Sequence, residues 1–144
     1  MNIDISAAAL ATIISTLVST IVAMIINKHN SLKRLDDQLE NILKISIEYP
    51  YLESEKFTKT WILNKDSDKE EYLRYDCYCT MVFNYLERLC RHYKFDTKKI
   101  EYQPLNIRAW VRLHKDYWNH PSDEFENIEG YPKEFKNIIR EYLS

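Results

Sequence analysis

The sequence predicts an all-α protein in which an N-terminal transmembrane helix is followed by a small cytoplasmic helical bundle. Residues 5–26 contain no charged side chain, although the chain as a whole is polar, with a mean hydropathy of -0.49. Beyond this segment, apolar residues recur at spacings of three and four, as they do on one face of a helix. No stretch alternates between apolar and polar residues for long enough to predict a strand.

Length and composition exclude several classes of protein. The 144 residues suffice for one compact domain and a membrane segment. The single glycine, Gly130, excludes phosphate-binding loops, dinucleotide folds and nucleophile elbows, each of which needs several glycines. Cys77, Cys79 and Cys90 are odd in number, and the first two point to nearly opposite sides of a helix. We therefore expect buried reduced thiols rather than a metal site or a disulfide.

The apolar segment is predicted to be a membrane anchor that the mature protein retains. As a helix, residues 5–26 rise about 33 Å, which spans a hydrocarbon core of about 30 Å. A secretory signal peptide carries Lys or Arg ahead of its apolar run, and residues 1–4 contain neither. Lys28, Lys33 and Arg34 follow the segment. This charge bias places the N-terminus outside and the C-terminal domain in the cytoplasm.

Small and hydroxyl-bearing side chains fall on one face of the anchor, within an arc of roughly 140°. They are Thr12, Ser15, Thr16, Ser19, Thr20 and Ala23, and Asn27 extends the same stripe past the membrane. Large apolar side chains occupy the opposite face, so we expect this hydroxyl stripe to face something other than lipid. Close packing of helices is one interpretation, and a pore with hydroxyls around a wet axis is the other. Both predict that the protein associates with itself, and the residues alone favour packing.

The sequence divides into three regions. Residues 1–30 hold a short outside tail and the anchor, residues 31–48 a juxtamembrane stalk helix, and residues 49–144 a helical sensor or interaction domain. Apolar side chains in the stalk recur at spacings of three and four, at Leu32, Leu35, Leu39 and Ile42. A coiled-coil-like stalk and an amphipathic helix packed on its own domain both fit this pattern. The proline that follows Tyr49 ends the helix.

Three further helices are expected in the domain. Residues 67–70 match a capping box, which would open a central helix running to about Tyr93. Its main apolar face holds Tyr72, Tyr75, Cys79, Val82, Leu86, Leu89 and Tyr93, and is widened by Cys77, Met81 and Phe83. A third helix covers about residues 104–118. The last helix begins near residue 130 and faces the core with Phe135, Ile138, Ile139 and Tyr142.

Cations and aromatic rings alternate in and around the third predicted helix. Single-stranded nucleic acid and nucleotides need this chemistry, because cations bind phosphates and flat rings stack on bases. The predicted ligand-binding residues are Arg91, Lys94, Lys98, Lys99, Arg108, Arg112, Lys115, Tyr117 and Trp118. With 20 Lys and Arg against 22 Asp and Glu, the chain has no general attraction for polyanions, so binding would depend on this patch. In the alternative interpretation, Trp110, His114 and Trp118 are core residues and the cations form a solvated surface.

Catalysis, a cofactor and a bound metal are not predicted. Arg108 and His114 resemble the Arg-x4-6-His element of HEPN ribonucleases, which are small helical dimers, so an anchored ribonuclease is kept as a minor alternative. Ala109 stands where that family usually has a polar residue, and the apolar neighbours of His114 predict a core histidine. His120, Asp123 and Glu124 lack the paired histidine spacing of a metal site.

The arrangement as a whole resembles the small single-pass membrane effectors of bacterial anti-phage defence, the Hailong-type channel effectors in particular. The resemblance rests on the anchor and on the patterns at residues 83–87, 110–114 and 131–135. It implies a homo-oligomeric channel, a tetramer in that family, in the bacterial inner membrane. It also implies a nucleotide or single-stranded DNA signal, made by a partner nucleotidyltransferase, that controls the channel. On this resemblance we rank the pore above plain packing.

Overall fold

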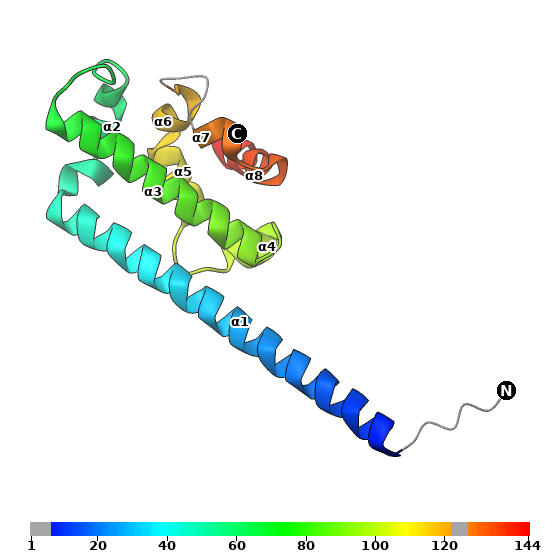
Figure 1. Ribbon diagram of the computed structural model, residues 1–144. Helices are drawn as coiled ribbons and strands as arrows, with labels where there is room; N and C mark the ends of the chain where they lie inside the picture. Colours follow the sequence, from blue (N-terminus) through cyan, green and yellow to red (C-terminus); the bar gives the residue numbers. More distant parts are fainter. Residues whose placement is uncertain (1–6, 122–126) are drawn as a thin grey trace. The chain divides into compact units, whose positions relative to one another are not determined.

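The computed structural model describes residues 7–121 and 127–144, and every regular element within them is helical (Figure 1). The all-α prediction is therefore confirmed. The chain divides into two compact units, Met1–Arg34 and Leu35–Ser144. Helix α1 (Ala7–Glu48) contributes its first part to one unit and its last part to the other.

The first part of α1 has the character of a membrane span. Its residues 7–30 are all exposed, and no charged residue occurs before Lys28 in this helix. The mean hydropathy of its most apolar stretch of 18 residues is 2.3. Among the described residues, α1 is the one helix long and apolar enough to cross a bilayer. The predicted apolar N-terminal helix is thus present and begins at Ala7, the first described residue.

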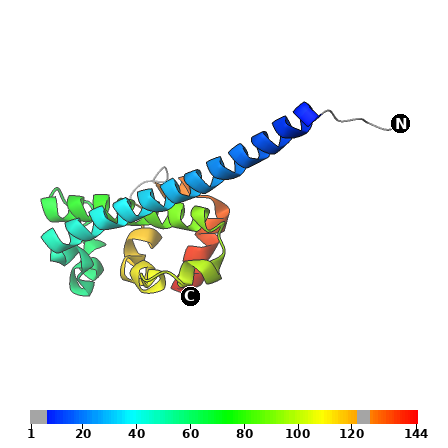
Figure 2. The same cartoon turned by 90° about the horizontal axis from the view of Figure 1, so that it is seen from below.

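The last part of α1, residues 35–48, belongs to the domain. It runs alongside α3 (Glu70–His92) in the two views of Figures 1 and 2. Leu35 and Ile42 are buried in the domain core, and Leu39 packs against that core. Of the two interpretations of this segment, the amphipathic helix packed on its own domain is therefore the one that the structure has.

Two short elements that the sequence analysis did not predict follow α1. A 3₁₀ helix, η1 (Pro50–Glu53), begins at the proline, and α2 (Glu55–Trp61) comes directly after it. The helix break at Pro50 was predicted correctly, because proline cannot donate the hydrogen bond that would continue α1. Elements of four and seven residues are too short to show a helical period, although Leu52 and Trp61 are fully part of the core.

Helix α3 is the central helix of the domain, as predicted, and most of its predicted apolar face is buried. Two residues that were expected to widen this buried face, Cys77 and Met81, are exposed, whereas Phe83 is buried. The expectation of three buried thiols was therefore wrong for Cys77, while Cys79 and Cys90 are buried. At about 100° per residue, Cys77 and Met81 lie about 200° and 240° around the helix from the buried Tyr75, so both point away from the core.

The predicted capping box at residues 67–70 was wrong. The N-cap residue of α3 is Lys69, and no side chain caps this end of the helix. The hydroxyl of Ser67 instead accepts a weak hydrogen bond, at 3.4 Å, from the backbone N–H of Lys69, just before the helix begins. A serine or aspartate before a helix can bond locally in this way, so the pattern alone does not fix the cap.

The third predicted helix is divided in the structure. Helix α5 (Ile107–Leu113) begins where the side chain of Asn106 accepts a hydrogen bond from the Ala109 N–H, at 3.0 Å. It ends at His114, whose backbone leaves the helical region, and α6 (Lys115–Asn119) follows. A continuous helix over residues 104–118 was thus wrong at its start and at this break.

Three smaller helices complete the domain. Helix α4 (Thr97–Glu101) is capped by Asp96, and α7 (Asn127–Gly130) precedes α8 (Lys133–Leu143). The four residues of α8 that were predicted to face the core are all buried. They join one hydrophobic cluster that includes residues of α1, α2, α3 and α5, and this cluster holds the domain together.

Candidate functional site

The predicted hydroxyl stripe lies on the exposed first part of α1, where every residue of the stripe is accessible. Its threonines bond within the helix. The hydroxyl of Thr12 donates to the carbonyl of Ala8 at 2.9 Å, Thr16 donates to Thr12 at 2.9 Å, and Thr20 donates to Thr16 at 2.8 Å. A threonine that bonds its own backbone carries its hydroxyl into an apolar environment at reduced cost. The stripe is therefore compatible with close helix packing as well as with a wet axis.

Six of the seven predicted ligand-binding cations are exposed, and three of the seven pair locally with carboxylates. Arg91 pairs with Glu87, Lys99 with Asp96 at 3.1 Å, and Arg108 with Glu101 at 2.9 Å. Lys94 and Lys98 are exposed nearby in the sequence. Pairs of this kind at the surface contribute about 0–1 kcal/mol, so a bound polyanion could displace the carboxylates at little cost.

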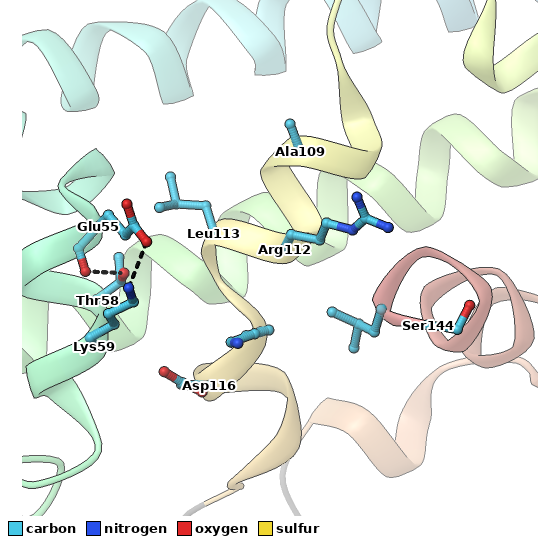
Figure 3. Close-up of a pocket in the computed structure, with 10 residues that line it drawn as sticks. Glu55, Thr58, Lys59, Ala109, Arg112, Leu113, Asp116 and Ser144 are labelled. Carbon is cyan, nitrogen blue, oxygen red and sulfur yellow. Dashed lines mark hydrogen bonds and ion pairs between the residues drawn. The ribbon is translucent and has the colours of Figure 1, made fainter.

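The structure brings Arg112 and Lys115 together with Lys59, which the sequence analysis did not select. The three surround a cavity of about 510 Å³, shown in Figure 3. We call it the cationic groove, and its lining residues are Glu55, Thr58, Lys59, Ala109, Arg112, Leu113, Lys115, Asp116, Leu143 and Ser144. Among these side chains, three cations outnumber two carboxylates, which favours an anionic ligand.

Two of the three cations in the cationic groove are held in place. The Arg112 Nε–H donates to the backbone carbonyl of Tyr142 at 2.9 Å, which directs the guanidinium toward α8 (Figure 3). The Lys59 ammonium lies 2.6 Å from Glu55 Oε1. A fixed guanidinium loses little conformational entropy when it binds a phosphate, so Arg112 is the best-placed phosphate ligand of the groove.

The two predicted stacking residues lie in the aromatic core. Tyr117 is only 6% exposed and is stacked on Phe83, with 5.9 Å between ring centroids. Trp118 is half-buried and contacts Phe83 and Tyr131 at centroid separations of 4.9 and 5.7 Å. The ring of Tyr117 offers no free face to a base, so we leave it out of the proposed ligand surface.

A buried polar cluster, which the sequence analysis missed, is centred on Glu53 of η1. Glu53 Oε1 accepts hydrogen bonds from the Tyr78 hydroxyl and, at 2.8 Å, from the Trp110 indole N–H. His114 Nε2 lies 3.4 Å from the same oxygen, and Nδ1 lies 3.0 Å from the Tyr75 hydroxyl. We call these five residues the Glu53 cluster. It joins η1, α3 and α5 across the core.

The Glu53 cluster explains the place of His114. The ring is 0% exposed, and one neutral tautomer satisfies both nitrogens, with Nε2–H donating to Glu53 and Nδ1 accepting from Tyr75. The expectation of a core histidine is confirmed, as is that of a core tryptophan at Trp110. Arg108, the other residue of the ribonuclease-like pattern, pairs instead with Glu101.

Burial and hydrogen bonding act in opposite directions on the charge of the cluster. Burial raises the pKa of the Glu53 carboxyl, but the hydrogen bonds from His114, Tyr78 and Trp110 outweigh it, and the net pKa lies below its usual value. Burial also raises the pKa values of Tyr75 and Tyr78. At neutral pH, Glu53 is therefore an ionised acceptor surrounded by hydrogen-bond donors.

This arrangement predicts a stability difference that depends on pH. Because the pKa of Glu53 is lower in the folded domain, its ionised form stabilises the fold at neutral pH. That contribution is lost as the pH falls from the unfolded-state value of about 4.3 through the lower folded value. We expect wild type to be more stable than Glu53→Gln at pH 7 and the difference to shrink as the pH falls below about 4.3 and through the lower folded-state value. Urea unfolding followed by tryptophan fluorescence tests this, and an unchanged difference would contradict it.

The described residues contain no group of three or more His, Cys, Asp and Glu side chains that could hold a metal ion. Two of the three residues considered for a metal, Asp123 and Glu124, lie outside the described residues, and the third, His120, is exposed.

Comparison of the chain with models of protein families, with curated proteins and with solved structures gives no match.

Proposed function

We propose that the protein is a homo-oligomeric membrane effector whose anchor helices form an ion-conducting pore in a bacterial inner membrane. The cytoplasmic domain controls conduction by binding a nucleotide or a single-stranded DNA oligomer from a partner nucleotidyltransferase. The observation that carries this proposal is the exposed first part of α1, which is apolar on one face and hydroxyl-bearing on the other. An anchor that contacts only lipid does not need its hydroxyl-bearing and apolar side chains on separate faces. Helices that associate with one another do need this separation.

The proposed orientation rests on charge. Lys28, Lys33 and Arg34 follow the apolar stretch, while no Lys or Arg precedes it. Positive residues next to a membrane span remain on the cytoplasmic side, so the N-terminus would lie outside and the domain inside.

The proposed ligand rests on the cationic groove. Arg112, Lys115 and Lys59 line it from three helices, and guanidinium and ammonium groups form strong charge-assisted hydrogen bonds with phosphate. Arg91, Lys94, Lys98 and Lys99 are also exposed and would offer further phosphate contacts. In this proposal the domain acts by binding and not by catalysis.

The pore predicts an ion flux that depends on the hydroxyl stripe. Full-length protein in liposomes should release trapped potassium, and replacing Thr12, Ser15, Thr16 and Ser19 together by leucine should reduce the release to that of empty vesicles. Leucine closes the polar face and leaves no path for hydrated ions. The matched control replaces Ile14, Val18, Ile21 and Ile25, four residues of the apolar face, by leucine, and should conduct as wild type does.

A second candidate, a membrane-anchored interaction module without a pore, is favoured by one observation. The Thr12, Thr16 and Thr20 hydroxyls are already bonded within the helix, so the stripe does not require water. In that case the leucine variant changes cross-linking between copies, and neither it nor wild type conducts in any condition. Ion flux through the wild-type protein that is absent from the leucine variant would decide for the pore.

The cationic groove predicts loss of binding on charge removal. Arg112→Gln with Lys115→Gln should weaken the binding of a fluorescent single-stranded oligonucleotide at least about tenfold. It should also lower the slope of log affinity against log salt by about 1.4, since two phosphate contacts disappear. Fluorescence anisotropy measures both. Lys69→Gln with Arg88→Gln removes the same charge from exposed positions of α3 and its N-cap, and should change neither; equal effects of the two pairs would refute a local site.

A further inference from the structure

A second cavity lies beside α5, next to the cationic groove. Its volume is about 320 Å³, and its lining comes from α1, η1, α5 and the segment before α5. We call it the apolar groove, and its lining residues are Leu43, Ser46, Glu53, Leu105, Asn106, Ala109, Trp110 and Leu113. Glu53 is the one charged side chain among them. Ala109 and Leu113 also line the cationic groove, so the two cavities adjoin.

In the apolar groove, the hydrogen bonds seen at the Glu53 carboxylate all involve one of its two oxygens. Tyr78, Trp110 and His114 all approach Oε1 of Glu53, and within the described part of the chain no hydrogen bond or ion pair is seen at Oε2. The side chain is 31% exposed and lines the groove. The oxygen left to a ligand is therefore Oε2 of a carboxylate that lines a mostly apolar groove.

The chemistry of the apolar groove selects a cation on an apolar stem. The aliphatic side chains of Leu43, Leu105 and Leu113 suit methylene groups, and an ionised carboxylate at the base suits a guanidinium or ammonium. Long basic side chains combine these two parts. We propose that the apolar groove binds an arginine or lysine side chain of a partner protein, with the charged end on Glu53 Oε2.

The surface around the groove favours a peptide over a free amine. Leu43 is 43% exposed and Ile47, one turn further along α1, is 77% exposed. Exposed neighbouring apolar residues of this kind are costly in water and are covered when an amphipathic helix docks. The partner inferred is thus an amphipathic segment that inserts one basic side chain. This inference is independent of the proposed signal ligand, which would occupy the cationic groove.

The indole of Trp110 reports on this site directly. Its N–H donates to the other oxygen of the same carboxylate, so a cation at Oε2 should shift its NMR resonance. Full-length protein labelled with ¹⁵N-tryptophan in detergent micelles is titrated with N-butylguanidinium, n-butanol and butyrate. We expect a saturable shift of Trp110 with the guanidinium only, while Trp61 and Trp118 serve as references. No selective shift of Trp110 would overturn the site.

A helical peptide with one central arginine flanked by leucines then distinguishes a partner segment from a free amine. It should bind at least tenfold more tightly than N-butylguanidinium, and replacement of its arginine by norleucine should remove that gain. Equal affinities of the peptide and the small cation would overturn the docking of a partner protein.

Variants at the rim test the site without breaking the Glu53 cluster. Leu43→Arg places a bulky cation of the chain itself at the groove and should abolish binding of N-butylguanidinium. Ile47→Arg makes the same change on the same helix at a residue outside the groove lining, and should bind as wild type does. Equal loss in both variants would show a general charge effect and refute the proposed site.

Discussion

Replacing Glu53 by leucine should lower the free energy of unfolding by about 3–5 kcal/mol. The Tyr78 hydroxyl, the Trp110 indole N–H and the His114 ring all lose their acceptor, and none of the three donors can turn to water without opening the core. Each buried donor left without a partner costs about 1–3 kcal/mol. The loss therefore approaches the whole stability of a small domain.

Glu55→Leu is the matched control for this prediction. Glu55 lies two residues further along the chain, its side chain is 73% exposed, and it forms an ion pair with Lys59 on the same helix. Removing an exposed pair of this kind costs less than about 1 kcal/mol. Urea unfolding in detergent, followed by tryptophan fluorescence, measures both variants. Similar losses for the two would show that Glu53 is no more important than a surface carboxylate.

The second large effect is expected in the membrane. Leu17→Arg together with Ile21→Arg places two charges on the apolar face near the middle of the anchor. The two side chains are 58% and 56% exposed on α1, so they would face lipid. At about 2.5–3.5 kcal/mol for each arginine, insertion would be disfavoured by about 5–7 kcal/mol. We expect the variant to be largely absent from the membrane fraction.

Leu43→Arg together with Ile47→Arg provides the control, with the same substitutions at the same spacing on the same helix but beyond the apolar stretch. This variant should remain in the membrane. Alkaline carbonate extraction followed by immunoblotting separates inserted protein from peripheral protein. Equal extraction of both variants would mean that residues 7–26 do not anchor the chain.

Long periodic patterns were the part of the fold that the sequence could predict. Helices α1, α3 and α8 repeat their apolar residues over several turns, so their faces were predicted almost entirely from spacing. The short helices η1, α2 and α4 have four to seven residues and show no such repeat. Tertiary packing decides their conformation, and a local pattern does not contain it.

Tyr117 shows why the site was harder to predict than the fold. It was selected because it alternates with cations along the sequence, but in a helix it lies seven residues from Trp110 and so only about 20° from it around the axis. Arg112 and Lys115 are exposed on the other face, and Tyr117 packs in the core beside Phe83. The Glu53 cluster could not be predicted for a different reason. The partners of Glu53 lie 25, 57 and 61 residues away in the sequence, and no spacing rule connects residues so far apart.

The cationic groove could be predicted from the sequence only in part. Arg112 and Lys115 were predicted from their alternation with aromatic residues, whereas Lys59 was not, because α2 itself was not predicted. A cluster that several short elements assemble becomes visible only when those elements are placed in space.

The internal bonding of the anchor threonines has a chemical consequence for any path that the helices enclose. The hydroxyls of Thr12, Thr16 and Thr20 each donate their hydrogen to a backbone carbonyl of the previous turn. What remains to face a neighbour or an ion is oxygen lone pairs, spaced about 6 Å apart along the helix axis. A row of oxygen acceptors can replace the hydration shell of a cation but not that of an anion. Along these three threonines, a pore built from these helices would therefore favour potassium or sodium over chloride.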